Sequence, residues 1–270
     1  MQVLTPEQRT QFEHEGFVRV CGAFASEAAA AMRDVIWEEL RERYGVDRDD
    51  RSTWTVEFPA HLQGLKRRPE FRAISSSRTI GAIDDLLGEG NWDHPRHWGA
   101  FFIVFPKETR SWTVPSEGWH VDAEYTAPPE PLFGLKVFAL LGDVAPRAGG
   151  TMLVVGMHRV IPSFVAKQPP EIVGKLPRAR KALMRSHPWL VELSKPGDGS
   201  ERVERFMLRE GEIGGVPVRV VEVTGNAGDV VLVHPWLLHV RPVNAGSDPR
   251  FVLAKDLPRN GGHMHRYAVR

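Results

Sequence analysis

Hydrophobic and polar residues in the first third of the chain follow the three- to four-residue period of amphipathic helices. Thr5, followed by a proline, predicts the start of a short helix that Gly16 ends. A longer helix is predicted from its cap at Ser26 to Gly45, and a third over residues 78–88. This part of the chain is therefore expected to be mostly helical.

From about residue 98 the pattern changes to short apolar runs bounded by Gly, Pro and Asp, which are typical of β-strands. Several runs are apolar at successive positions, as expected for strands that are covered on both faces. The predicted strands are WGAFFIVFP, GLKVFALLGDV, TMLVVG, VPVRVVEVTG, GDVVLV and RFVLAKDL.

A helical, proline-punctuated segment between about residues 158 and 200 interrupts the strands, and we assign an insertion to about 165–220. Its basic stretch at 178–185 is expected to be a solvated helix face, with a lid over a site as the alternative. Repeats, low-complexity segments and long polar linkers are absent from the sequence. We therefore expect one domain over residues 1–270, mainly β, with the helices of about 1–90 packed on a double-stranded β-helix, the cupin-like jelly roll.

Composition restricts the function classes. Hydrophobic residues make up 42% and charged residues 26%, and the net charge is +1, which favours neither nucleic acid nor a membrane as partner. Cys21 is the only cysteine, so no intramolecular disulfide and no cysteine-based zinc or iron–sulfur site is available. With no apolar leader and no apolar run of membrane-spanning length, the cytoplasm is the expected compartment.

The sequence His120-Val121-Asp122 is the first candidate for metal chemistry. In a strand, residues two apart point to the same face, so His120 and Asp122 would project side by side. His239, which follows another apolar run, is the candidate third ligand. His234 competes with it but directly precedes a proline and lacks the eleven-residue offset of His239 from Arg250.

Two imidazoles and one carboxylate on one face are typical of non-haem iron(II) oxygenases, and zinc is also compatible with these ligands. Arg250 favours iron, because its guanidinium suits bidentate binding of a carboxylate. We expect it to hold the far carboxylate of 2-oxoglutarate.

The motifs WHVD, AGGTMLVVGMHR and GDVVLVHPWLLHVRPVNAGSDPR resemble the phytanoyl-CoA dioxygenase-like branch of the iron(II)/2-oxoglutarate oxygenases. GFVRVCGAFASEAAAAMR matches the family's strand followed by a helix, so the resemblance covers about residues 10–260. The resemblance implies iron bound by His120, Asp122 and His239, with Arg250 as co-substrate anchor and Thr151 as a second hydrogen-bond donor.

The resemblance also implies a reaction. Dioxygen and 2-oxoglutarate would be consumed, succinate and carbon dioxide released, and a hydrogen removed from a small organic substrate. Halogenating relatives lack the carboxylate ligand, so Asp122 favours hydroxylation or another oxidation. Arg241 departs from the family pattern, which often has Ser or Thr two residues after the distal histidine.

Other residues near the motifs are weaker candidates. Trp119, Tyr125 and Trp236 flank the ligands, so one or more of them are candidates to line the pocket, with core packing as the default expectation for aromatic residues. Lys136 and Arg241 are candidates to meet an anionic substrate or the co-substrate, or else to form surface ion pairs. His158 is expected to be structural, and loop or tail surface is predicted for His94, His97, His263 and His265.

Two other functions use the same ligands. A zinc hydrolase would need a general base near the metal and gives Arg250 no task. A sensor would bind metal and 2-oxoglutarate, or another small acid, without turnover. The sequence gives no indication of oligomeric state.

Overall fold

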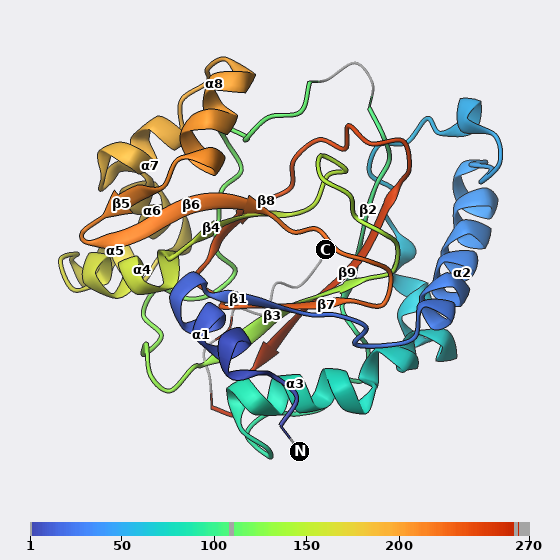
Figure 1. Ribbon diagram of the computed structural model, residues 1–270, viewed down its shortest axis with the longest axis horizontal. Helices are drawn as coiled ribbons and strands as arrows, with labels where there is room; N and C mark the ends of the chain where they lie inside the picture. Colours follow the sequence, from blue (N-terminus) through green and yellow to red (C-terminus); the bar gives the residue numbers. More distant parts are fainter. Residues whose placement is uncertain (1, 108–110, 262–263, 265–270) are drawn as a thin grey trace.

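Two antiparallel β-sheets form the centre of the computed structural model, which describes residues 2–107, 111–261 and 264 (Figure 1). The larger sheet has the order β1-β7-β3-β9-β2 and the smaller one β5-β6-β4-β8. The strands of the larger sheet are β1 (Phe17–Val20), β2 (Ala100–Val104), β3 (Gly134–Leu140), β7 (Val230–Val233) and β9 (Arg250–Pro258). Those of the smaller sheet are β4 (Met152–Val155), β5 (Gly211–Ile213), β6 (Val216–Glu222) and β8 (Leu238–Val240).

Strand β3 shows why the predicted strands are apolar at successive positions. All seven of its residues are buried. Phe138 and Leu140 belong to the cluster between the sheets, whereas Val137 and Ala139 belong to the cluster that the N-terminal helices cover. Both faces of the larger sheet are therefore in the core, and the expected mainly β fold with flanking helices is confirmed.

Helices of the first ninety residues pack on the outer face of the larger sheet (Figure 1). Met32, Ile36 and Leu40 of α2 have no solvent-exposed surface. Their spacing is the apolar stripe that the sequence shows. The helices are α1 (Pro6–Glu15), α2 (Ser26–Tyr44) and α3 (Ser77–Leu87), with 3₁₀ turns η1 (Arg51–Thr53), η2 (Leu62–Arg67) and η3 (Pro69–Ser75).

The structure confirms the cap predicted for the first helix and contradicts the cap predicted for the second. The Thr5 side chain accepts the Gln8 N–H in a capping box, as predicted. The cap predicted at Ser26 is wrong, because Ala25 occupies that position and Ser26 is the first helical residue. The preceding Phe24 is buried and its N–H is bonded to the Gly228 carbonyl, which fixes how the chain enters the helix.

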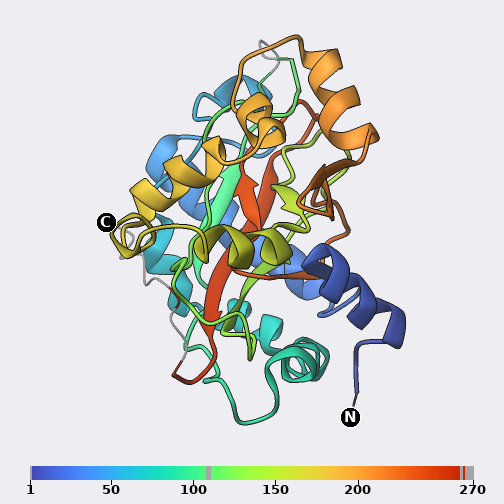
Figure 2. The ribbon, with the colours of Figure 1, turned by 90° about the vertical axis from the view of Figure 1, so that its left-hand side faces the viewer.

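Short helices follow β4 and gather beside β5 and β6 at one end of the molecule (Figures 1 and 2). They are α4 (Met157–Val165), α5 (Pro170–Val173), α6 (Leu176–Arg185), α7 (Pro188–Leu193) and α8 (Gly199–Val203), followed by the π-helical turn η4 (Glu204–Leu208). The expected end of the insertion, at 220, falls inside β6. Strands β5 and β6 already belong to the smaller sheet, so the helical excursion is over at Leu208. Within the described residues, no helix combines the length and apolarity needed to cross a bilayer.

Candidate metal centre

Two backbone hydrogen bonds hold His120 and His239 opposite each other. The His239 N–H donates to the His120 carbonyl (2.9 Å) and the His120 N–H donates to the His239 carbonyl (3.1 Å). His239 lies in β8, but His120 forms only an isolated bridge, so the strand expected around it is wrong. Gly118, with φ of +85°, turns the chain just before His120. The two histidines are therefore held opposite each other across an isolated β-bridge.

Three side-chain donors converge at this bridge. Asp122 Oδ2 lies 3.1 Å from His239 Nε2, and Asp122 Oδ1 lies 3.6 Å from His120 Nε2. One ligand atom from each of the three residues lies within 4.8 Å of the other two. The set agrees with the ligands chosen from the sequence.

Hydrogen bonds on the far side of each imidazole orient the rings for a cation. His120 Nδ1 lies 2.7 Å from the Gly118 carbonyl, and His239 Nδ1 lies 3.1 Å from the Leu237 carbonyl. Because a carbonyl only accepts, each Nδ1 donates, and in the neutral ring Nε2 keeps its lone pair. Two lone pairs and a carboxylate then face one point, an arrangement that fits a divalent metal ion.

Lys136 fixes the charge of Asp122. Its Nζ lies 2.5 Å from Asp122 Oδ2 and 2.8 Å from Asp256 Oδ1. Burial by itself raises the pKa of Asp122, but its contacts with His239 and with the positive charge of Lys136 outweigh it and hold this pKa well below its usual range. Burial opposes the charge of Lys136 too, yet the two carboxylates raise its pKa. Both groups are therefore ionised at neutral pH.

Arg250, the first residue of β9, is a buried cation beside this centre. It is 2% exposed, and its Nη1 donates to the Gly149 carbonyl (2.5 Å) and to Thr151 Oγ1 (3.3 Å). Its Nε is buried with no partner among the described residues. Burial, reinforced by the charge of Arg241, lowers the pKa of Arg250 to about 9, so the guanidinium stays charged at neutral pH. A buried charge is unfavourable unless it is paired, so this guanidinium favours the binding of an anion.

One cavity of about 330 Å³ joins the three metal-ligand candidates to Arg250 and Thr151. Lys136 and Arg241, both predicted from the sequence, also line it. The prediction missed further lining residues, namely Lys66, Gly99, Ala100, Phe102, Phe138, Val240, Ala254, Lys255 and Asp256. Side chains alternate between the two faces of a strand, so Arg250, Ala254 and Asp256 of β9 share one face. This alternation is the sequence signal that could have identified Ala254 and Asp256 as lining residues.

The three aromatic candidates for the pocket lie in the core, which is the default expectation for them. Trp119, Tyr125 and Trp236 are at most 3% exposed and are not among the residues that line the cavity. The Trp119 indole N–H donates to the Pro115 carbonyl and that of Trp236 to the Glu124 carbonyl. Trp119 adjoins His120, and neighbouring side chains on extended backbone point to opposite sides, which explains its direction.

The remaining histidines separate into different environments. His234 packs against His158, with ring centroids 5.0 Å apart, away from the metal-ligand candidates. His94 stacks on Trp92. His97, expected on the surface, lines the cavity, which corrects that prediction. His263 and His265 lie outside the described residues.

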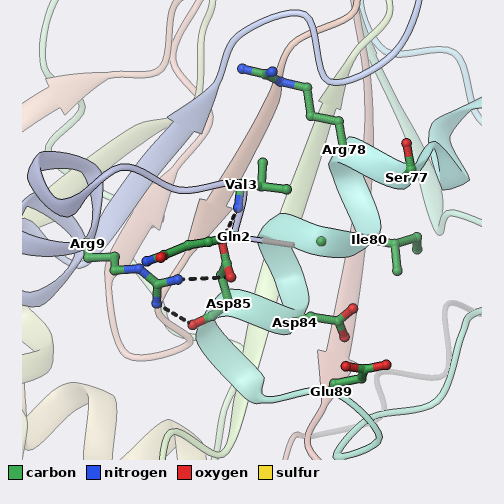
Figure 3. A pocket seen from close by; sticks show the side chains of 10 residues that line it. Gln2, Val3, Arg9, Ser77, Arg78, Ile80, Asp84, Asp85 and Glu89 are labelled. Atoms are coloured by element: carbon green, nitrogen blue, oxygen red, sulfur yellow. Dashed lines mark hydrogen bonds and ion pairs between the residues drawn. The ribbon is translucent and has the colours of Figure 1, made fainter.

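A larger groove of about 920 Å³ lies between the N-terminal segment and α3 (Figure 3). The Asp85 carboxylate accepts the N–H groups of Val3 and Leu4 (2.7 Å each) and pairs with Arg9 at 2.9 Å. These charged groups satisfy one another, as the dashed contacts in Figure 3 show. The charged groups of this groove therefore attach the N-terminal segment to α3, and the smaller cavity is the candidate functional site.

Comparisons with known proteins agree with this geometry. The family model described as Phytanoyl-CoA dioxygenase (PhyH) matches residues 12–252. No curated protein matches the chain. Similar solved structures include AviO1 from Streptomyces viridochromogenes Tue57 (TM-score 0.55, 16% identity, 97% of this chain and 98% of that chain). HygX from Streptomyces hygroscopicus with nickel and 2-oxoglutarate bound (0.54, 17%, 95% and 87%) and the α-ketoglutarate-dependent carbocyclase SnoK from nogalamycin biosynthesis (0.55, 18%, 99% and 88%) are also similar.

The structural neighbours are under 25% identical to this chain, so they establish its fold. The family model covers most of the sequence and establishes its family. The chain belongs to the phytanoyl-CoA dioxygenase family, a group of non-haem enzymes that depend on iron and 2-oxoglutarate.

Proposed function

We propose that the protein is an iron(II)- and 2-oxoglutarate-dependent dioxygenase that hydroxylates a small organic molecule and releases succinate and carbon dioxide. The observation that supports it is the single cavity shared by the His120, Asp122 and His239 donors and the buried Arg250. We place the reaction in the cytoplasm, because one exposed cysteine suits a reducing compartment.

In this proposal His120, Asp122 and His239 hold the iron. These three protein ligands would leave other coordination positions of the ion for the co-substrate and dioxygen. Iron bound there supplies the oxidising chemistry, in which dioxygen is reduced as 2-oxoglutarate and the substrate are oxidised. Asp122 fills the position that halogenating relatives leave open, which favours hydroxylation.

The chain's own residues then bind and orient the reactants. Arg250 and the Thr151 hydroxyl bind the far carboxylate of 2-oxoglutarate, because Arg250 is a desolvated cation with an unused N–H. Lys136 holds one oxygen of Asp122 and leaves the other for the metal. Phe138 and Ala254, both nearly buried, form part of a wall that limits water.

Spectroscopy with and without oxygen tests the proposal. Anaerobic protein with iron(II) and 2-oxoglutarate should give a weak visible charge-transfer band, and admitting oxygen with a substrate panel should yield succinate. The band should be absent from His120→Ala. It should persist in the matched control His94→Ala, which changes an exposed histidine outside the cavity.

Other results would assign a different function. Hydrolysis that zinc alone supports would favour a zinc hydrolase on the same ligands. Binding of metal and 2-oxoglutarate without succinate across the whole panel would favour a sensor.

A further inference from the structure

Arg250 is held by one short stretch of main chain, residues 147–151, which we call the anchor loop. The two hydrogen bonds that the Arg250 side chain makes with the described part of the chain both end there. Its Nη1 donates to the Gly149 carbonyl (2.5 Å) and to the Thr151 hydroxyl oxygen (3.3 Å). The direction of the guanidinium therefore depends on where this loop lies.

The anchor loop has a shape that its own sequence does not favour. Arg147 has a φ of +69°, in the left-handed region that residues with a side chain rarely adopt. The loop also passes close to the end of β6, because a Cβ on Gly150 would lie 2.2 Å from the Val223 carbonyl oxygen. A backbone in this conformation needs hydrogen bonds from outside the loop to hold it.

Glu222, the last residue of β6, supplies two of those bonds. Its Oε2 accepts the Arg147 N–H (2.8 Å) and its Oε1 accepts the Gly150 N–H (3.0 Å). Glu222 is paired with Met152 of β4, directly after the loop, and Figure 1 shows β4 and β6 side by side. Each oxygen of one carboxylate thus fixes a different part of the loop, on either side of the Gly149 carbonyl.

Two effects of Glu222 on an anion at Arg250 have opposite signs. Its negative charge disfavours a second anion nearby, whereas its hydrogen bonds keep the guanidinium in place for one. The carboxylate oxygens face the loop amides, and no ion pair joins Glu222 to Arg250 in the described part of the chain. We expect the two direct hydrogen bonds to outweigh the more distant charge.

We infer that Glu222 is a positioning residue for the co-substrate. It holds the anchor loop, the loop holds Arg250 through the Gly149 carbonyl and the Thr151 hydroxyl, and Arg250 binds the distal carboxylate of 2-oxoglutarate. This assignment rests on the proposed function, because it takes 2-oxoglutarate to be the ligand of Arg250.

Binding of two related acids tests the inference without turnover. Zinc-loaded protein is titrated by calorimetry with 2-oxoglutarate and with 2-oxopentanoate, in which a methyl group replaces the distal carboxylate. Glu222→Gln keeps the shape of the side chain but replaces one accepting oxygen with an amino group. It should reduce the preference for 2-oxoglutarate by about 5- to 10-fold, the value of one hydrogen bond to a charged group.

Controls separate this effect from damage to the fold. The affinities for zinc and for 2-oxopentanoate should be unchanged in Glu222→Gln, because neither ligand uses the distal anchor. Glu212→Gln, at an exposed glutamate of β5 in the same sheet, should leave all three affinities as they are. Tighter binding of 2-oxoglutarate by Glu222→Gln would show that the charge outweighs the hydrogen bonds, and would overturn the inference.

A double-mutant cycle tests whether Glu222 acts through Arg250. Arg250→Ala removes the group that the loop positions, so adding Glu222→Gln to it should cause little further loss of the preference for 2-oxoglutarate. A purely structural glutamate would give losses that add, and additive losses would refute the positioning role.

Hydrogen exchange tests the same coupling in the unmodified protein, whether or not a variant folds. Because coupling between two sites is reciprocal, saturating 2-oxoglutarate should slow exchange at the amides of Arg147 and Gly150. Saturating 2-oxopentanoate should not. Exchange that responds equally to both acids would count against the inference.

The two hypotheses fail in different ways. An unchanged preference in Glu222→Gln removes the positioning role, while binding of 2-oxoglutarate by the wild-type protein leaves the proposed function standing. A metal-loaded wild-type protein that does not bind 2-oxoglutarate would overturn the proposed function and this inference with it.

Discussion

Lys136 is the residue on which the acidic side of the metal centre depends. It lies between Asp122 and Asp256, and its side chain is 8% exposed. Two carboxylates brought together away from solvent repel each other unless a cation separates them. The lysine supplies that charge even before a metal binds.

Removal of this cation should destabilise the metal-free protein. We expect Lys136→Met to lower the free energy of unfolding by about 3 kcal/mol, because it leaves partly buried carboxylates without their partner. Urea denaturation measures the change. Adding Asp256→Asn to the variant should recover part of the loss, and an unchanged stability would contradict this role.

A variant of Arg250 should separate the binding of 2-oxoglutarate from the binding of the metal. Arg250→Ala should weaken 2-oxoglutarate binding by about 10- to 100-fold, since it removes hydrogen bonds to a charged group. Iron should bind as before, because Arg250 contributes no donor to the metal. Calorimetric titration with each ligand checks this, and an equal loss of both would mean that the fold had been damaged.

At the residue level, sequence reasoning predicted the groups whose spacing is itself informative. His120, Asp122 and His239 follow from ligand spacing and family motifs, and the structure gathers them. Lys66 and His97 were not predicted to line a pocket, because a 3₁₀ turn and an irregular loop have no periodicity that reveals which way a side chain points.

At the level of elements, apolar runs predicted the long strands and missed the short ones. The strands β5 and β8 have three residues each, too few for a pattern, and they exist because β6 and β4 pair with them. The pairing of β8 with β4 is non-local, so it is invisible in a short window of sequence. The strand β5 forms a local hairpin with β6 through Gly214 and Gly215, a turn signal that could have revealed it. The helix starts were predicted to within one residue, because caps are local.

The N-terminal segment is attached to α3 through one carboxylate (Figure 3). Asp85→Asn should cost about 1–3 kcal/mol of stability, because it weakens the hydrogen bonds from Val3 and Leu4 and the pair with Arg9. Hydrogen exchange should quicken at those two amides. Glu89→Gln, in the same groove but exposed, should change neither quantity, and unchanged exchange in Asp85→Asn would refute the attachment.

For the whole molecule, buried histidines set a lower limit of pH for stability. Burial and the nearby His158 lower the pKa of His234 well below the usual value for histidine, and burial lowers that of His158. The unfolded chain then binds more protons than the folded one below about pH 6.5. The contribution of these two histidines to the free energy of unfolding is therefore fully present above that pH. It is lost as the pH falls toward the folded pKa values, by up to about 1.4 kcal/mol per pH unit for each histidine.

Thermal unfolding between pH 5 and pH 8 measures this dependence. His234→Gln should reduce its slope whatever the variant does to stability at neutral pH, and His94→Gln, at an exposed histidine remote from the buried pair, serves as the control. A slope that His234→Gln leaves unchanged would assign the acid sensitivity to other groups.

The backbone bridge between His120 and His239 has a consequence for how the protein acquires its ion. The separation of the two imidazoles is set by a pair of main-chain hydrogen bonds, so we expect the two rings to stay opposite each other without the ion. Chelation should therefore leave the circular dichroism spectrum intact, and restored ferrous ion should return full occupancy without refolding.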